Sequence, residues 1–93
     1  MRRYELTVIF PMEEDQHKAG RELLLSDLSA NGVEIEKTDE LGDRSLAYEI
    51  KKRKTGKYVL FVIKADPAKV TVLDRIFKLN ANLMKFLFVR LDE

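Results

Sequence analysis

The middle of this chain reads Gly42-Asp43-Arg44-Ser45-Leu46-Ala47-Tyr48-Glu49-Ile50-Lys51 and continues directly into Lys52-Arg53-Lys54-Thr55-Gly56-Lys57. The first part alternates, with Leu46, Tyr48 and Ile50 on one face, which predicts a β-strand. Thr55-Gly56 is typical of a turn, and the apolar segment Tyr58–Ala65 follows it. The stretch therefore predicts a β-hairpin whose turn carries a group of basic residues.

The residues before the hairpin predict a strand, a helix and the start of another strand. Residues 2–10 alternate, and their apolar face is Tyr4, Leu6, Val8 and Phe10. Residues 15–31 have helical spacing, with an apolar face of Ala19, Leu23, Leu24 and Leu28. Gly32 is a helix-stop signal, and residues 33–35 begin a strand that is interrupted at Gly42, which predicts a bulge or bend.

The residues after the hairpin predict a second helix and a last strand. Asp66-Pro67 is typical of a helix start, with a capping carboxylate followed by proline in the first turn. The apolar face of this helix is Val70, Leu73, Ile76 and Phe77, and its expected end lies near residues 80–82. A final strand is expected over residues 83–91.

The predicted order is therefore β-α-β-β-α-β, within one domain that spans residues 1–93. Short right-handed crossovers favour a ferredoxin-like α+β fold. Its antiparallel sheet would have the order 4-1-3-2, with both helices on one face. The first and third strands would be central, which agrees with their apolar sequences, and the other face of the sheet would be uncovered.

Composition excludes several classes of protein. The chain is 45% apolar and 35% charged, which suits a folded soluble domain. It has no cysteine, so disulfides and thiolate zinc sites are excluded. There is no apolar run of about 20 residues that could span a bilayer, and the N-terminus lacks a signal-peptide pattern. We expect a cytoplasmic protein without a membrane contact.

Catalysis finds little support in the sequence. His17 is the only histidine, and its polar surroundings predict exposure to solvent. The acidic residues Glu13, Glu14 and Asp15 are interpreted as complementing the helix dipole rather than binding a metal. The four glycines stand apart, so no phosphate-binding loop is present. We expect no enzyme, no cofactor, no metal and no small-molecule substrate.

Proteins with three other functions share this topology, and the sequence argues against two of them. An acylphosphatase-like enzyme would need a phosphate-binding loop after the first strand, where Pro11-Met12-Glu13-Glu14 stands instead. An RNA-recognition motif would need exposed aromatic residues on its central strands, whereas most of those here are expected in the core. A ferredoxin-like regulatory domain that binds a small ligand remains as the alternative function, and a ligand-induced thermal shift would detect it.

Positive charge is concentrated in the hairpin. Five of the seven residues from Lys51 to Lys57 are cations and none is acidic. The whole chain has 17 Lys and Arg against 16 Asp and Glu, so the rest of it has 12 cations against 16 acids. Such a local excess favours an anionic partner. Topology predicts a second, weaker group at the opposite end of the sheet, formed by Arg2, Arg3, Lys64 and Arg90 and diluted by Asp66, Asp92 and Glu93.

The stretch that runs from Gly42 to Lys51 also resembles a signature of a known family. The pattern Gly-x-Arg-x-Leu-Ala-Tyr-x-Ile-Lys is similar to that of the bacterial ribosomal protein S-six family, the sixth protein of the small subunit. Ser45 departs from the family's usual charged or amide residue. The opening Met1-Arg2-Arg3-Tyr4-Glu5, Lys57-Tyr58 and Asn82 are similar too, so the resemblance covers essentially the whole chain.

The resemblance implies a non-catalytic protein that binds the central domain of small-subunit ribosomal RNA together with ribosomal protein eighteen. The uncovered face of the sheet and a bare edge strand are both suited to that protein, and the second strand is expected to be such an edge, with Leu46, Tyr48 and Ile50 as the expected contacts. No residue that reads bases can be identified. The expected RNA contacts are Arg2, Arg3, Lys51, Lys52, Arg53, Lys54 and Lys57, with Arg44, Lys85 and Arg90 as secondary candidates.

Overall fold

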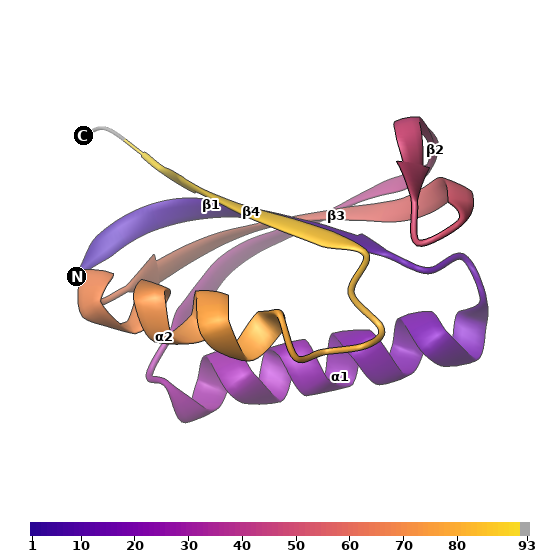
Figure 1. Cartoon of the computed structure of the whole chain (residues 1–93). Helices are drawn as coiled ribbons and strands as arrows, with labels where there is room; N and C mark the ends of the chain where they lie inside the picture. Colours follow the sequence, from indigo (N-terminus) through magenta and orange to yellow (C-terminus); the bar gives the residue numbers. More distant parts are fainter. Residues whose placement is uncertain (92–93) are drawn as a thin grey trace.

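The computed structural model describes residues 1–91, so the expectation for Asp92 and Glu93 concerns residues outside the described part. The strands and helices follow one another in the predicted order β-α-β-β-α-β (Figure 1). Their bounds are β1 (Arg2–Phe10), α1 (Glu14–Ala30), β2 (Glu34–Ile50), β3 (Arg53–Ala65), α2 (Pro67–Phe77) and β4 (Lys85–Arg90). Neither helix in this part of the chain is long and apolar enough to cross a membrane.

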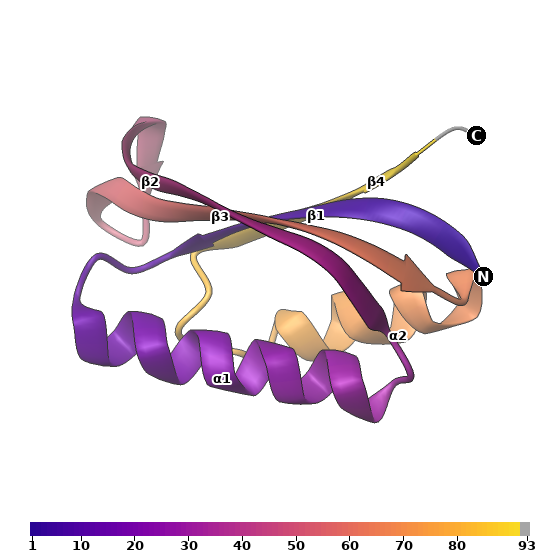
Figure 2. The same cartoon turned by 180° about the vertical axis from the view of Figure 1, so that it is seen from behind.

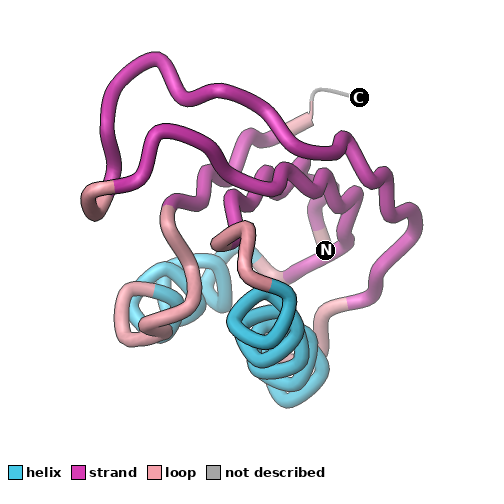
Figure 3. Tube along the Cα trace, turned by 90° about the vertical axis from the view of Figure 1, so that its right-hand side faces the viewer, coloured by secondary structure: helices cyan, strands magenta, loops and turns pink. Residues whose placement is uncertain are grey.

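The four strands form one antiparallel sheet in the order β2-β3-β1-β4, which confirms the predicted ferredoxin-like topology. Figures 1 and 3 show both helices on the same side of the sheet, while its other face is open. The β2–β3 hairpin extends beyond the sheet at the end where α1 begins, as the reverse view in Figure 2 also shows. The two central strands are β1 and β3, as their apolar sequences predict.

The core lies between the sheet and the helices. Alternate residues of the central strands point into it, and all are less than 9% exposed: Tyr4, Leu6, Val8 and Phe10 from β1, and Val59, Phe61, Ile63 and Ala65 from β3. From α1 the buried side chains are Leu24 and Leu28. The expectation that Ala19 and Leu23 share this face is wrong, because the helix turns Gly20 inward instead and leaves Leu23 49% exposed.

Gly20 allows the segment between α2 and β4 to lie directly on α1. A Cβ atom at Gly20 would stand 2.5 Å from the carbonyl oxygen of Asn82. The buried Asn80 completes the contact, because its side-chain amide donates to the carbonyl oxygen of Gly20 at 3.1 Å and its Oδ1 accepts from the backbone N–H of Asn82 at 3.0 Å. The close approach is thus between a helix and a connecting segment.

Helix α2 begins as predicted and ends earlier than predicted. Oδ1 of Asp66 accepts from the backbone N–H of Ala68 at 2.9 Å, and Pro67 occupies the first turn. The last helical residue is Phe77 rather than a residue near 80–82, since Asn80 leaves the helix to contact α1. Strand β4 then begins at Lys85, two residues after the expected start.

Strand β2 is one continuous element of 17 residues, although the sequence pattern is interrupted. Its pairing with β3 shifts register at three places, one of them between Glu40 and Gly42. Gly42 has a φ of 84°, a conformation that glycine adopts without steric cost. The bulge expected at this glycine is therefore confirmed.

Candidate nucleic-acid interface

The hairpin turn is formed by Lys51 and Lys52, between the paired residues Ile50 and Arg53. The expectation that Thr55-Gly56 forms this turn is wrong, because both residues lie within β3 opposite Ser45 and Arg44. Gly56 serves packing instead, since a Cβ atom there would stand 2.4 Å from Cγ2 of Ile9. The basic residues consequently occupy the tip of the hairpin and the start of β3.

Both lysines of the turn adopt left-handed backbone conformations, with φ of 50° at Lys51 and 63° at Lys52. Two-residue hairpin turns of this kind are usually formed by Asn-Gly or Asp-Gly, because other residues meet steric repulsion there. That repulsion costs about 1–2 kcal/mol per residue. Turn propensity therefore does not explain why lysine occupies these two positions.

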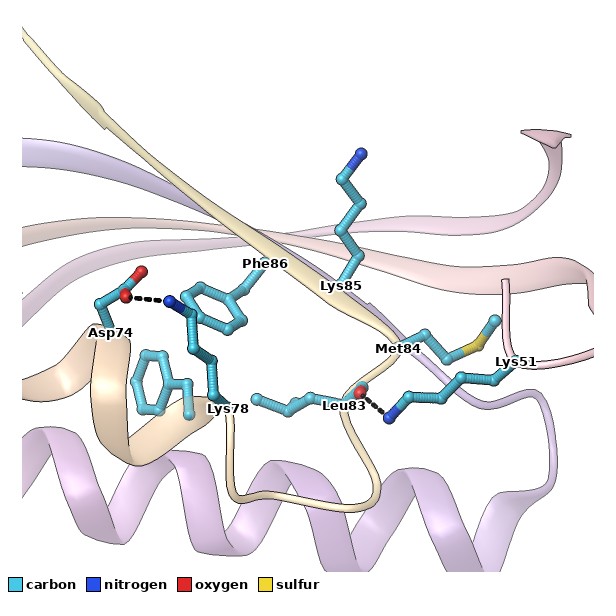
Figure 4. Close-up of a pocket in the computed structure, with 8 residues that line it drawn as sticks. Lys51, Asp74, Lys78, Leu83, Met84, Lys85 and Phe86 are labelled. Atoms are coloured by element: carbon cyan, nitrogen blue, oxygen red, sulfur yellow. Dashed lines mark hydrogen bonds and ion pairs between the residues drawn. The ribbon is translucent and has the colours of Figure 1, made fainter. Parts of the chain in front are cut away.

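Two cations of the hairpin form hydrogen bonds with other parts of the protein. The Arg53 guanidinium donates to both carboxylate oxygens of Glu13 and, at 3.0 Å, to Oε1 of Gln16. The pKa of Glu13 is lowered chiefly by this hydrogen bond. Nζ of Lys51 donates to the carbonyl oxygen of Leu83 at 2.9 Å (Figure 4). These contacts hold the hairpin against the start of α1 and the segment before β4.

The other cations of this end are available to an external anion. Lys52 and Lys54 are exposed and make no hydrogen bond or ion pair within residues 1–91. Lys57 is half-buried. Arg44 is exposed, and within residues 1–91 its side chain makes one hydrogen bond, to the carbonyl oxygen of Leu41 at the limiting distance of 3.5 Å. The tip lysines therefore form the most accessible positive surface of the hairpin.

Lys85 joins this end of the molecule through Tyr48. Its ammonium donates to the Tyr48 hydroxyl at 2.9 Å and lies 5.4 Å from the ring centroid. The hydrogen bond raises the pKa of Lys85. Tyr48 is 61% exposed, whereas Leu46 and Ile50 are half-buried. A register shift between residues 45 and 50 interrupts the regular pairing of this segment, so the three residues do not form the simple strand face that their alternation predicts.

The second basic group lies at the opposite end of the sheet, as predicted. Arg3 faces Lys64 across the β1–β3 pair, and Tyr4 faces Arg90 across the β1–β4 pair. Nε of Arg3 contacts Oε1 of Glu36 at 2.7 Å, and Nζ of Lys64 lies 3.7 Å from the same carboxylate. Arg2 and Arg90 are exposed. The length of β1 separates the two groups by about 26 Å.

The groups that pair with these cations could not be identified from the sequence. They are Glu13, Gln16, Glu36 and the carbonyl oxygen of Leu83. Each lies more than 25 residues from its partner, and local spacing carries no information about such distant pairs. The nearest sequence signal for one of these pairs is the acidic run that begins at Glu13. In the structure Glu13 forms no side-chain cap on α1 and instead accepts from Arg53.

His17 is not the exposed residue that the sequence predicts. Its ring packs on Phe10 with centroids 4.9 Å apart, and its Nε2 atom is buried without a hydrogen-bond partner among the described residues. Burial, followed by repulsion from Lys57 and Arg21, lowers the pKa of His17, although Glu40 and Glu14 act in the opposite direction. The imidazole is consequently held in its neutral form.

Acid should therefore destabilise the protein before its carboxylates titrate. A histidine whose pKa is lowered by folding contributes stability that is complete above its unfolded pKa of about 6.5 and is lost as the pH falls below that value. We expect the free energy of unfolding, measured in urea, to fall between pH 7 and pH 5. His17→Leu should flatten this dependence, and equal slopes in the two proteins would contradict the assignment.

The chain is similar along its whole length to proteins of the small ribosomal subunit. A family model described as ribosomal protein S6 matches residues 3–90. Small ribosomal subunit protein bS6 of Treponema denticola is 53% identical over 93 residues, with all of both chains covered. The bS6 protein of Treponema pallidum is 40% identical over 92 residues, which is 99% of each chain.

A solved structure supports the fold independently. The crystal structure of 30S ribosomal protein S6 from Thermotoga maritima superimposes with a TM-score of 0.85 and 22% sequence identity. The match covers 97% of this chain and 87% of that one. At this identity the likeness shows a shared fold.

Proposed function

Because the chain belongs to the ribosomal protein S6 family, we propose that it binds the central domain of small-subunit ribosomal RNA together with ribosomal protein eighteen. Family membership makes it a protein of the small ribosomal subunit, which works in the cytoplasm. The observation that carries RNA binding is the hairpin turn, where Lys51 and Lys52 occupy backbone conformations that lysine disfavours. Lys52 makes no hydrogen bond or ion pair within residues 1–91, so its charge is available to an anion, whereas Lys51 already donates to the carbonyl oxygen of Leu83.

The contacts we propose are with phosphates rather than bases. Tyr4 and Phe61 of the central strands are buried, so they cannot stack on bases. Affinity would instead come from the release of counterions by lysine and arginine. Lys52 and Lys54 would contact RNA directly, whereas Lys51 and Arg53 would also position the hairpin. The remaining proposed RNA contacts are Arg2, Arg3, Arg44, Lys57, Lys85 and Arg90.

The protein partner would bind the outer edge of β2. This strand is an edge of the sheet, so one side of its backbone is unpaired. Leu46, Tyr48 and Ile50 supply apolar surface next to the basic tip, and Tyr48 is the most exposed of them. RNA and ribosomal protein eighteen would then occupy adjoining surfaces of one hairpin.

Charge reversal at the two free lysines should weaken RNA binding. We expect Lys52→Glu with Lys54→Glu to lower the affinity for a central-domain RNA fragment by roughly tenfold or more, because phosphate contacts become repulsive. The slope of log K against log salt should become shallower by about 1.5, since each lost contact contributes roughly 0.7–0.9. Filter binding across a salt series, with ribosomal protein eighteen present, measures both values.

A matched control separates this effect from net charge. Lys69→Glu with Arg75→Glu makes the same charge change on exposed residues of α2, outside the hairpin. This variant should keep the salt slope of the unmodified protein. If both double variants lose affinity equally, or if neither does, the hairpin is not an RNA contact.

A further inference from the structure

A groove runs between α2 and the outer edge of β4. It consists of two hollows, of about 330 Å³ and about 370 Å³, which share Asp74 and Phe86. Val70 and Thr71 line the outer hollow, and Leu83 lies in the inner one, which Figure 4 shows in close-up. We call this feature the α2–β4 groove.

The edge of β4 that borders this groove has unpaired backbone groups. Leu91 N–H donates to the carbonyl oxygen of Arg3, the residue that faces it across the β1–β4 pair, at 3.0 Å. In an antiparallel pair, hydrogen-bonded and non-hydrogen-bonded residues alternate. The N–H and C=O groups of Phe86, Phe88 and Arg90 therefore point outward, away from β1.

The same residues supply an apolar wall on the helix side. The ring of Phe77, from α2, stacks on Phe88 with centroids 5.9 Å apart and meets Phe86 edge-on at 5.4 Å. Both phenylalanines of β4 are only half-buried. An added strand could thus form backbone hydrogen bonds with β4 and place alternate apolar side chains against these rings.

The charges around the groove are mostly positive. Among the described residues that line it, Asp74 is the only acid, and it is already paired with Lys78 at 2.9 Å. The cations that line the groove or end the strand are Lys51, Lys78, Lys85 and Arg90. In Figure 4 Lys85 points to the open face of the sheet, so cations flank the edge on both sides.

From the outward backbone groups, the apolar hollows and the surrounding cations, we propose that the edge of β4 binds an acidic, extended segment of another protein as a fifth strand. This edge is the one opposite to the proposed protein contact of β2, although Lys51, Lys85 and Arg90 also belong to the proposed RNA contacts. A second copy of the chain is disfavoured, because β4 itself carries Lys85 and Arg90 and no acid, so it lacks the negative charge that the surrounding cations favour. RNA fits less well, since phosphates accept hydrogen bonds and cannot donate to the outward carbonyl groups.

The test uses a synthetic probe and the full chain. The probe is an acetylated and amidated heptapeptide that alternates glutamate and valine, titrated into isotope-labelled protein and followed by NMR. We expect the backbone amide signals of Phe86 and Phe88 to shift more than those of Leu87 and Val89, whose N–H groups face β1. Thr71→Trp should weaken binding at least tenfold by filling the outer hollow. Val72→Trp, at the exposed neighbouring position, should change it less than twofold.

Several outcomes would overturn the proposal. One is an absence of shifts at millimolar peptide. Another is equal binding by a peptide with lysine in place of glutamate, or by one methylated at alternate backbone nitrogens. Equal shifts of the same amides by a single-stranded RNA oligonucleotide would assign this edge to nucleic acid instead.

Discussion

Replacement of Phe77 by alanine is expected to lower the free energy of unfolding by about 3–5 kcal/mol, the usual cost of removing a buried aromatic side chain. Phe77 is 1% exposed at the end of α2, and its ring contacts both Phe86 and Phe88. The substitution would remove apolar contacts and leave a cavity between α2 and β4. Urea denaturation followed by circular dichroism measures the loss.

Leu79→Ala provides the control for this experiment. Leu79 lies two residues further along the chain, but it is 84% exposed. Its truncation should change stability by less than about 0.5 kcal/mol. Similar losses in the two variants would mean that Phe77 does not support β4 as the structure indicates.

Gly20→Ala is expected to destabilise the protein by about 1–3 kcal/mol, even though alanine favours a helix by about 1 kcal/mol relative to glycine. The added methyl group would stand 2.5 Å from the carbonyl oxygen of Asn82, which is backbone and cannot rotate away. The segment carrying Asn80 and Asn82 would have to move off α1. For a domain of this size the melting temperature should fall by roughly 4–8 °C per kcal/mol.

Ser26→Gly on the exposed face of the same helix gives the complementary measurement. There the loss of helix propensity alone should cost roughly 0.5–1 kcal/mol. A Gly20→Ala protein that is more stable than the unmodified one would show that propensity outweighs the contact with Asn82.

The sheet order could be predicted because short crossovers leave few arrangements, and the apolar sequences of β1 and β3 agree with the central positions that these arrangements give them. The bulge at Gly42 was predictable for a similar reason, since a glycine interrupts an otherwise regular strand. The position of the hairpin turn was not predictable. Local chemistry favours Thr55-Gly56, but pairing of β2 with β3 and the lack of space beside Ile9 place Gly56 inside the strand.

The candidate site shows the same division between local and distant information. The charge of the hairpin could be read directly from Lys51 to Lys57. The sequence could not show which of these cations are free, because Arg53 is paired with Glu13, which lies 40 residues earlier in the chain. The orientation of His17 depended likewise on the packing of α1 against Phe10.

The position of β1 between β3 and β4 has a consequence for the synthesis of this chain. Strand β1 leaves the ribosome first, yet the residue that faces Tyr4 on one side is Arg90, near the end of the described chain. A nascent chain that has emerged only as far as α2 can pair β1 with β3, but the other edge of β1 stays open. Such an unpaired edge can pair with other chains. Completion of the sheet therefore waits for the synthesis of β4, and a delay between α2 and β4 would prolong the exposure of this edge.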